Sequence, residues 1–275
     1  MEDQRDDGYH ADTRWVPGGG QTRSVRSFVV RRARMNQSHK SALRDHGAKY
    51  VREASRVCRD PLAAFPSSVG PSAGGRLILE IGFGMGHATA RFAEAHPNDA
   101  ILGIEVYPPG VGRLINDLEQ NEIDNVRIVR ADAVDVLSAW RTTCSIDAIH
   151  VFFPDPWPKK RHHKRRLVQA SFLELARLRI RVGGYLYLVT DWEDYALHMR
   201  DIASGFEGFS IEDADADGFS RPREWRPGTA FERKAVSTPV LKNSPPFNGG
   251  HCMQPSCIGR LKIITPRARV LSPAG

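Results

Sequence analysis

The chain has 275 residues, enough for one large α/β domain with extensions, and carries a formal net charge of +7 with a pI of about 9.4. This basic balance favours a polyanionic partner such as a nucleic acid. Four unevenly spaced cysteines exclude a disulfide framework, and no apolar run reaches the roughly 20 residues of a membrane span. The N-terminus also lacks the apolar segment of a signal peptide, so we expect a soluble cytoplasmic protein.

Composition divides the chain into four segments. Residues 1–22 are polar and glycine-rich, which predicts a disordered N-terminal tail. Residues 23–75 form a basic extension and linker, with nine Lys or Arg between Arg23 and Arg52 against the single acid Asp45. The main folded domain is expected over residues 76–234. Residues 235–275 form an atypical tail.

Short apolar runs alternate with helical patterns, which is typical of a parallel sheet with crossover helices in a Rossmann-like, doubly wound α/β fold. In chain order, the pattern predicts strands at 76–81, 100–105, 126–130, 146–153, 184–190 and 209–214. It predicts helices around 41–58 and at 89–96, 111–121, 133–140, 166–181 and 194–204.

The first predicted strand leads into a glycine-rich loop containing Gly82, Gly84 and Gly86. Alternate glycines let the backbone turn sharply and approach a ligand at the mouth of the sheet. Glu80 precedes this loop, and its carboxylate would repel a pyrophosphate but attract a cationic ligand such as S-adenosylmethionine. Glu105 ends the second predicted strand and Asp132 follows the third, where acids can bind a ribose diol and an adenine edge. The motif therefore predicts S-adenosylmethionine as the cofactor.

A second motif follows the fourth predicted strand. Prolines 154, 156 and 158 restrict the backbone around Asp155 and Trp157, so the loop presents one carboxylate between aromatic rings. The next eight residues, 159–166, contain six Lys or Arg and two His, a density that suits nucleic-acid phosphates. A solvated charged face is the alternative interpretation of this run. We predict that a nucleic acid is modified near Asp155.

Together these motifs resemble the bacterial tRNA (guanine-N7-)-methyltransferases, which modify the guanine at position 46 of the tRNA variable loop. The resemblance covers roughly residues 23–232. It rests on Arg26-Ser27-Phe28, Glu80–Gly86, Gly103-Ile104-Glu105, the 152–166 block, Thr190-Asp191-Trp192-Glu193 and Thr229-Ala230-Phe231-Glu232. It implies a class I S-adenosylmethionine-dependent methyltransferase domain over residues 76–234 and tRNA as partner.

The resemblance also implies roles for individual residues. Residues implied to contact S-adenosylmethionine are Glu80, Gly82, Gly84, Gly86, Glu105, Asp132 and Asp155, and Asp155 is also the candidate catalytic acid. Residues implied to contact the substrate guanosine are Lys159, Asp191, Thr229, Ala230, Phe231 and Glu232. The candidates for tRNA phosphates are Arg161, His162, His163, Lys164, Arg165 and Arg166. Phe153, Trp157 and Phe231 are candidates to stack on the extruded base, and Trp157 is equally interpreted as a wall of the loop.

Two other functional classes are open to the sequence. A nicotinamide oxidoreductase is disfavoured by Glu80 and by the G-x-G-x-G spacing. A tRNA-binding homologue without activity is compatible with the atypical tail. We assign no metal, because His162 and His163 are adjacent and surrounded by cations, and the C-terminal His and Cys residues supply only three ligands. Which tRNAs are used, and whether the protein is a monomer or a homodimer, is open.

From about Ala235 the chain departs from the family pattern and becomes rich in Pro, Gly and Ser, which predicts disorder. Our hypothesis is a reading-frame shift near codon 235. In this class of fold the closing strand inserts antiparallel between strands five and six. Residues 261–265 are the only segment of the tail that could form it.

Overall fold

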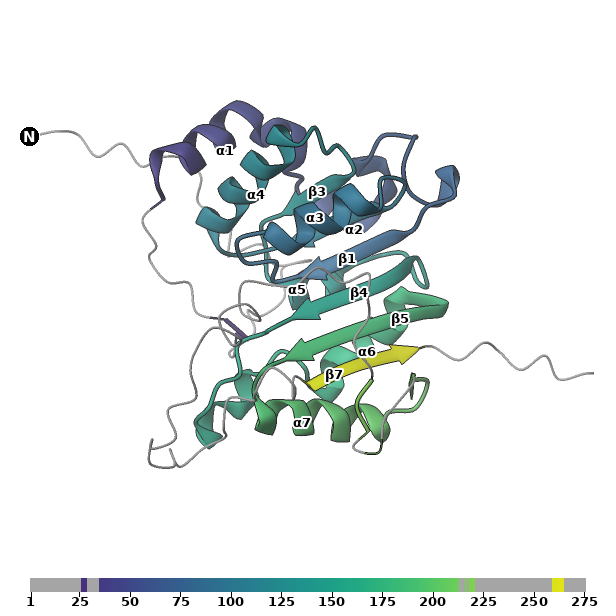
Figure 1. Ribbon diagram of the computed structural model, residues 1–275. Coiled ribbons are helices and arrows are strands. Elements are labelled where there is room, and N and C mark those ends of the chain that lie inside the picture. The colour runs from purple at the N-terminus through teal and green to yellow at the C-terminus, as the bar shows by residue number, and fades with distance from the viewer. Residues whose placement is uncertain (1–25, 29–34, 213–215, 217, 221–258, 265–275) are drawn as a thin grey trace, which may run out of the picture.

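The computed structural model describes residues 26–28, 35–212, 216, 218–220 and 259–264. In this part of the chain a seven-stranded sheet lies between two layers of helices (Figure 1). The strands are Leu77–Ile81 (β1), Ala100–Ile104 (β2), Val126–Val129 (β3), Ile146–Phe152 (β4), Ile180–Thr190 (β5), Ser210–Ile211 (β6) and Gly259–Ile264 (β7). The α-helices are Gln37–Tyr50 (α1), Ala54–Arg59 (α2), His87–Ala95 (α3), Pro108–Gln120 (α4), Ala133–Ala139 (α5), Ala170–Arg179 (α6) and Glu193–Ser204 (α7). The 3-10 helices are Leu62–Ala64 (η2), Pro71–Ala73 (η3) and Lys160–Arg165 (η4).

The strand order is β3-β2-β1-β4-β5-β7-β6. Strands β1 to β5 pair in parallel, whereas β7 runs antiparallel to both β5 and β6. The order reverses between β1 and β4, so the connections leaving these strands diverge to opposite faces and open a crevice at their carboxyl ends. This topology confirms the predicted Rossmann-like fold and places the crevice at the carboxyl ends of β1 and β4.

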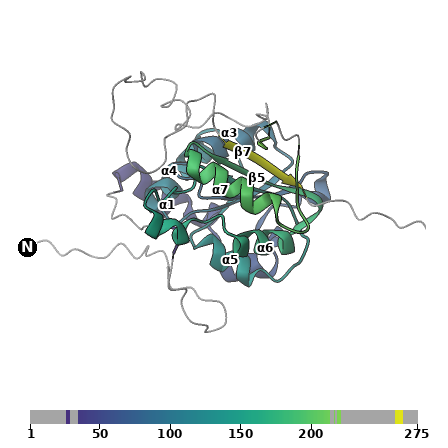
Figure 2. The same cartoon turned by 90° about the horizontal axis from the view of Figure 1, so that it is seen from below.

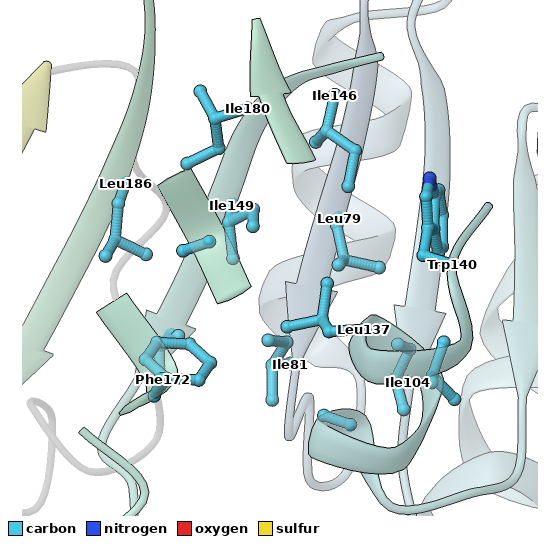
Figure 3. Packing of buried hydrophobic residues seen from close by; sticks show 14 of the residues in the cluster. Leu79, Ile81, Ile104, Leu137, Trp140, Ile146, Ile149, Phe172, Ile180 and Leu186 are labelled. Atoms are coloured by element: carbon cyan, nitrogen blue, oxygen red, sulfur yellow. The ribbon is translucent and has the colours of Figure 1, made fainter. Parts of the chain in front are cut away.

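Both faces of the sheet are covered. Helices α2, α5, α6 and α7 contribute to one apolar cluster, and α1, α3 and α4 contribute to the other. Figure 2 shows α5 and α6 across the sheet from α3, and Figure 3 shows how Leu79, Ile149 and Phe172 pack in the first cluster. All residues of β1 and β2 are buried, as expected for parallel strands covered on both faces.

The N-terminal extension is an integral part of this fold. The single helix predicted around 41–58 is wrong, because the chain breaks at residues 51–53 into α1 and α2. Arg52 N donates to Ile128 O at 2.8 Å, and Val51 forms a parallel bridge with Ile128, so the break shields the edge of β3. The hydroxyl of fully buried Tyr50 donates to Glu119 Oε1 at 2.6 Å and joins α1 to α4.

The helix predicted at 166–181 is also wrong at both ends. Residues 160–165 form η4, α6 begins only at Ala170, and β5 already begins at Ile180. Val168 N donates to Tyr195 Oη at 3.0 Å, so a tertiary contact holds residues 166–169 outside the helix. The sixth predicted strand, 209–214, is reduced to Ser210–Ile211, and residues 213–215 lie outside the described part.

The tail supplies the closing strand. β7 inserts between β5 and β6, with Ile263 opposite Leu186 on one side and Ile211 on the other, and it overlaps residues 261–265, the only candidate that the sequence offered for this strand. Residues 1–22 and 235–258 lie outside the described part, so the predicted disorder and the frameshift hypothesis stay predictions. None of the described helices is long and apolar enough to cross a membrane.

We predict that Ile263→Pro lowers the free energy of unfolding by about 3 kcal/mol, because proline removes a ladder hydrogen bond from a strand paired on both sides. Urea unfolding of the full chain measures this change, with Ile263→Val as the control. A proline variant as stable as the parent would contradict the pairing of β7.

Candidate functional site

The glycine loop between β1 and α3 has the backbone that the sequence predicts. Gly82, Gly84 and Gly86 have φ values of 73°, 58° and 78°, in the left-handed region that favours glycine. A Cβ on Gly86 would lie 2.6 Å from Leu114 Cβ, so a larger residue there would displace α4. A Cβ on Gly110 would lie 1.8 Å from Gly84 O, so the start of α4 packs directly against the loop.

Glu105 follows β2 and holds the glycine loop in place. Its Oε2 accepts a hydrogen bond from Gly84 N at 2.7 Å, and its Oε1 accepts from Val106 N at 2.6 Å and Tyr107 N at 2.9 Å. Burial raises the pKa of this carboxyl, the three backbone donors oppose that rise, and the charge of Asp155 adds to it. The buried carboxylate is therefore stabilised by oriented N–H groups.

The other two strand-end acids lie at different depths. Asp132 follows β3, begins α5 by accepting from Val134 N at 3.0 Å, and lines the cavity described below. Glu80 is 5% exposed on β1 and lies behind the glycine loop instead of among the residues that line the cavity. Burial raises the pKa of Glu80 to about 7. A cationic group approaching Glu80 would restore its ionised form.

The loop after β4 has a strained backbone. Phe153 and Trp157 have φ values of 50° and 47°, which are uncommon for residues with bulky side chains. Phe153 N donates to Val189 O at 2.8 Å, so the first turn of the loop is tied to β5. Between these two positions, exposed Asp155 reaches the rim of the cavity.

Trp157 links this loop to the N-terminal segment. Its Nε1 donates to Ser27 O at 3.1 Å, and the Arg165 guanidinium lies 4.2 Å from the centre of its ring. Arg165 Nε also donates to Arg26 O at 3.3 Å. Ser27, Phe28 and Phe153 line the cavity whereas Trp157 does not, so Trp157 acts as a support for the wall. The sequence did not predict this contact, because the motif Arg26-Ser27-Phe28 alone does not indicate what it packs against.

These elements enclose a cavity of about 700 Å³ at the switch point of the sheet, a size suited to a small-molecule cofactor. Its charged lining residues, among those the structure describes, are the carboxylates Glu105, Asp132 and Asp155. The other lining residues are Ser27, Phe28, Ile81, Gly82, Gly84, Ile104, Val106, Tyr107, Ala131, Ala133, Phe152, Phe153, Pro154 and Leu167. An acidic lining of this kind fits a cationic cofactor and opposes a pyrophosphate.

The predicted tRNA contacts fall into two groups. Lys159, Arg161 and Lys164 are exposed on or beside η4, and His162 and His163 are partly buried there. Arg165 is engaged with Trp157, and Arg166 is 3% exposed and paired with Asp194. The Arg166 side chain offers almost no surface, and its contact with phosphate stays a prediction.

The candidate guanosine contacts are only partly described. Asp191 follows β5 directly, at the same sheet edge as the cavity. Thr229, Ala230, Phe231 and Glu232 lie outside the described residues. Among the residues that the structure describes, no group of three or more His, Cys, Asp or Glu could hold a metal ion.

The strand order, the antiparallel β7 and an acid-lined cavity at the glycine loop define an S-adenosylmethionine-dependent methyltransferase. Residues 75–240 match a family model described as a putative methyltransferase. A tRNA (guanine-N(7)-)-methyltransferase from Marinobacter nauticus is 43% identical over 215 residues, covering 78% of this chain and 87% of the relative. A tRNA (guanine-N(7)-)-methyltransferase from Cupriavidus pinatubonensis is 42% identical over 214 residues, which cover 78% of this chain and 81% of the relative. The chain belongs to the tRNA (guanine-N7-)-methyltransferase family.

The buried, protonated state of Glu80 can be tested by the dependence of stability on pH. Its folded pKa of about 7 exceeds the ordinary value of 4.5, so the folded state holds this proton more tightly than the unfolded state. Stability from this group is fully present below pH 4.5 and is lost as the pH rises through 7, by about 3 kcal/mol in total. We predict that Glu80→Gln removes this loss from the cofactor-free protein.

Urea unfolding between pH 5 and 8, at roughly unit steps, measures the effect, since linkage makes stability follow proton binding. Glu174→Gln, at an exposed position on α6, is the control and should leave the pH dependence unchanged. Equal pH dependence in the parent and in Glu80→Gln would contradict the buried, protonated state of Glu80.

Proposed function

We propose that this protein transfers the methyl group of S-adenosylmethionine to N7 of the guanine at position 46 of tRNA. The observation that carries the proposal is the position of the acid-lined cavity. Asp155 lies on its rim, and the loop that bears Asp155 runs directly into the exposed basic residues of η4. The cavity suits the cationic cofactor, and the basic residues suit the polyanionic substrate. Asp155 lies where the two would meet.

The lining residues suggest how the cofactor would be held. When bound, S-adenosylmethionine supplies an electrophilic methyl group on a sulfonium. Gly82 and Gly84 allow close approach of the backbone, and Glu105 and Asp132 are the acceptors for the ribose and the adenine edge. Glu80, behind the glycine loop, would attract the amino group of the cofactor across the loop backbone. The carboxyl of Glu80 ionises more readily beside a cation.

Guanine chemistry explains why carboxylates suffice. N7 carries a lone pair and no proton at neutral pH, so its methylation needs no general base. The reaction needs N7 in line with the methyl group and an environment that stabilises a cationic product ring. Asp155 would supply that negative charge, and Asp191 and Glu232 would accept the N1–H and N2–H of the guanine. Phe153 lines the cavity and is the described candidate for stacking on the base.

The decisive assay is radiolabelled methyl transfer to unmodified tRNA, followed by nucleoside analysis for 7-methylguanosine. Chain cleavage at 7-methylguanosine then locates the modified position, and a tRNA with adenine at position 46 is the negative control. Binding of tRNA without methyl transfer would favour the inactive homologue. No observation on the described residues favours that alternative now.

We predict that Asp155→Ala lowers kcat by about 100-fold or more, because a preorganised charge at the reacting centre is lost. The thermal midpoint should stay unchanged, since Asp155 is exposed on a loop. Asp155→Asn separates charge from shape and should be similarly impaired. Turnover near that of the parent in both variants would overturn the role of Asp155.

We predict that Arg161→Ala with Lys164→Ala weakens tRNA binding and lowers the slope of log K against log salt by about 2, because two phosphate contacts are lost. Binding of S-adenosylmethionine should be unaffected, since neither residue lines the cavity. Titrations at several salt concentrations measure both quantities. An unchanged salt slope would identify η4 as a solvated charged face.

A further inference from the structure

Arg166 connects two parts of the site. Its side chain is 1% exposed and lies with its guanidinium 4.8 Å from the centre of the Tyr195 ring. Nε donates to Pro156 O at 2.9 Å, and Nη2 donates to Asp194 Oδ2. Nη2 also lies 3.1 Å from His163 Nε2. One planar cation therefore bonds in two directions at once, which suits the rigid fork of an arginine.

The two bonded segments carry the two sides of the proposed reaction. Pro156 directly follows Asp155, on the rim of the cavity. Asp194 lies in the first turn of α7, three residues after Asp191. The Arg166 guanidinium hydrogen-bonds directly to both of these segments.

Neighbouring contacts make the link rigid. Val168 N donates to Tyr195 Oη at 3.0 Å, and a His198 ring nitrogen lies 3.1 Å from Val168 O. The chain just after Arg166 is thereby fastened to α7. The Arg166 guanidinium also lowers the pKa of Asp194, so the pair stays ionised at neutral pH. Removing Asp194 would leave the buried Arg166 cation without its carboxylate partner, whereas the Asp194 side chain is 48% exposed and can be solvated.

We propose that Arg166 is a positioning residue that fixes the loop bearing Asp155 relative to the segment that runs from Asp191 into the first turn of α7. The inference rests on the proposed function, because it concerns the alignment of guanine N7 with the methyl group. In-line transfer is sensitive to placement, and an error of about 1 Å costs on the order of 100-fold in rate. Arg166 acts through the backbone of Pro156 and the carboxylate of Asp194 without touching either reactant.

The central variant is Arg166→Lys, which keeps the charge but lacks the planar fork that directs Nε at Pro156 O and Nη2 at Asp194. Arg177→Lys is the matched control, because Arg177 forms an exposed pair with Glu174 on α6. We expect kcat to fall about 100-fold in Arg166→Lys, with KM for both substrates within about 3-fold. The tRNA salt slope should not change, whereas loss of a phosphate contact would lower it by about 1.

A second variant keeps the test valid if the lysine variant does not fold. Arg166→Ala, assayed with and without added guanidinium chloride at low millimolar concentration, should regain part of its kcat, and Arg177→Ala should not respond. A kcat in Arg166→Lys within about 2-fold of the parent, a lowered salt slope, or absence of guanidinium rescue in a folded Arg166→Ala would each overturn the inference. An inactive parent protein would instead contradict the proposed function, so the two failures are distinguishable.

Discussion

Glu105 joins three parts of the chain that the rest of the site depends on. Its carboxylate accepts hydrogen bonds from Gly84 in the glycine loop and from Val106 and Tyr107 ahead of α4. A buried carboxylate needs such donors, because desolvation of a charge without partners costs several kcal/mol. The three bonds hold the loop and the entry to α4 at the carboxyl end of β2. Glu105 and Gly84, which this connection joins, both line the cavity.

The ionised forms of the acids in the site are destabilised by burial and by one another. Glu105, Asp132 and Asp155 share one cavity, and burial or mutual repulsion raises the pKa of Glu105 and of nearby Glu80. Such a cluster is least unfavourable when a cation enters it. A sulfonium cofactor would therefore gain affinity from charges that the empty fold stabilises only in part. Groups with perturbed pKa values commonly mark functional sites for this reason.

Residues 159–166 divide into exposed side chains and side chains engaged in contacts, a division that composition alone does not show. Arg161 and Lys164 face solvent, where they are available to phosphate, while Arg165 supports Trp157 and Arg166 bridges the catalytic loop and α7. The residues proposed to bind phosphate and the residues that support the loop are therefore adjacent, in η4 and in Arg166 directly after it. A tRNA seated on the exposed members would rest on an element already fastened to Asp194 and the Asp155 loop.

Periodicity and glycine spacing by themselves determined the parallel sheet and the order of its elements along the chain. They also placed Glu80, Glu105, Asp132 and Asp155 at or near strand ends, because these features depend on local pattern and on the polarity of parallel strands. The break between α1 and α2, the late start of α6 and the burial of Arg166 were decided only by the tertiary structure. Each depends on a partner far away in sequence, namely Ile128, Tyr195 and Asp194. Local propensity cannot encode such contacts, since they form only when distant segments pack together.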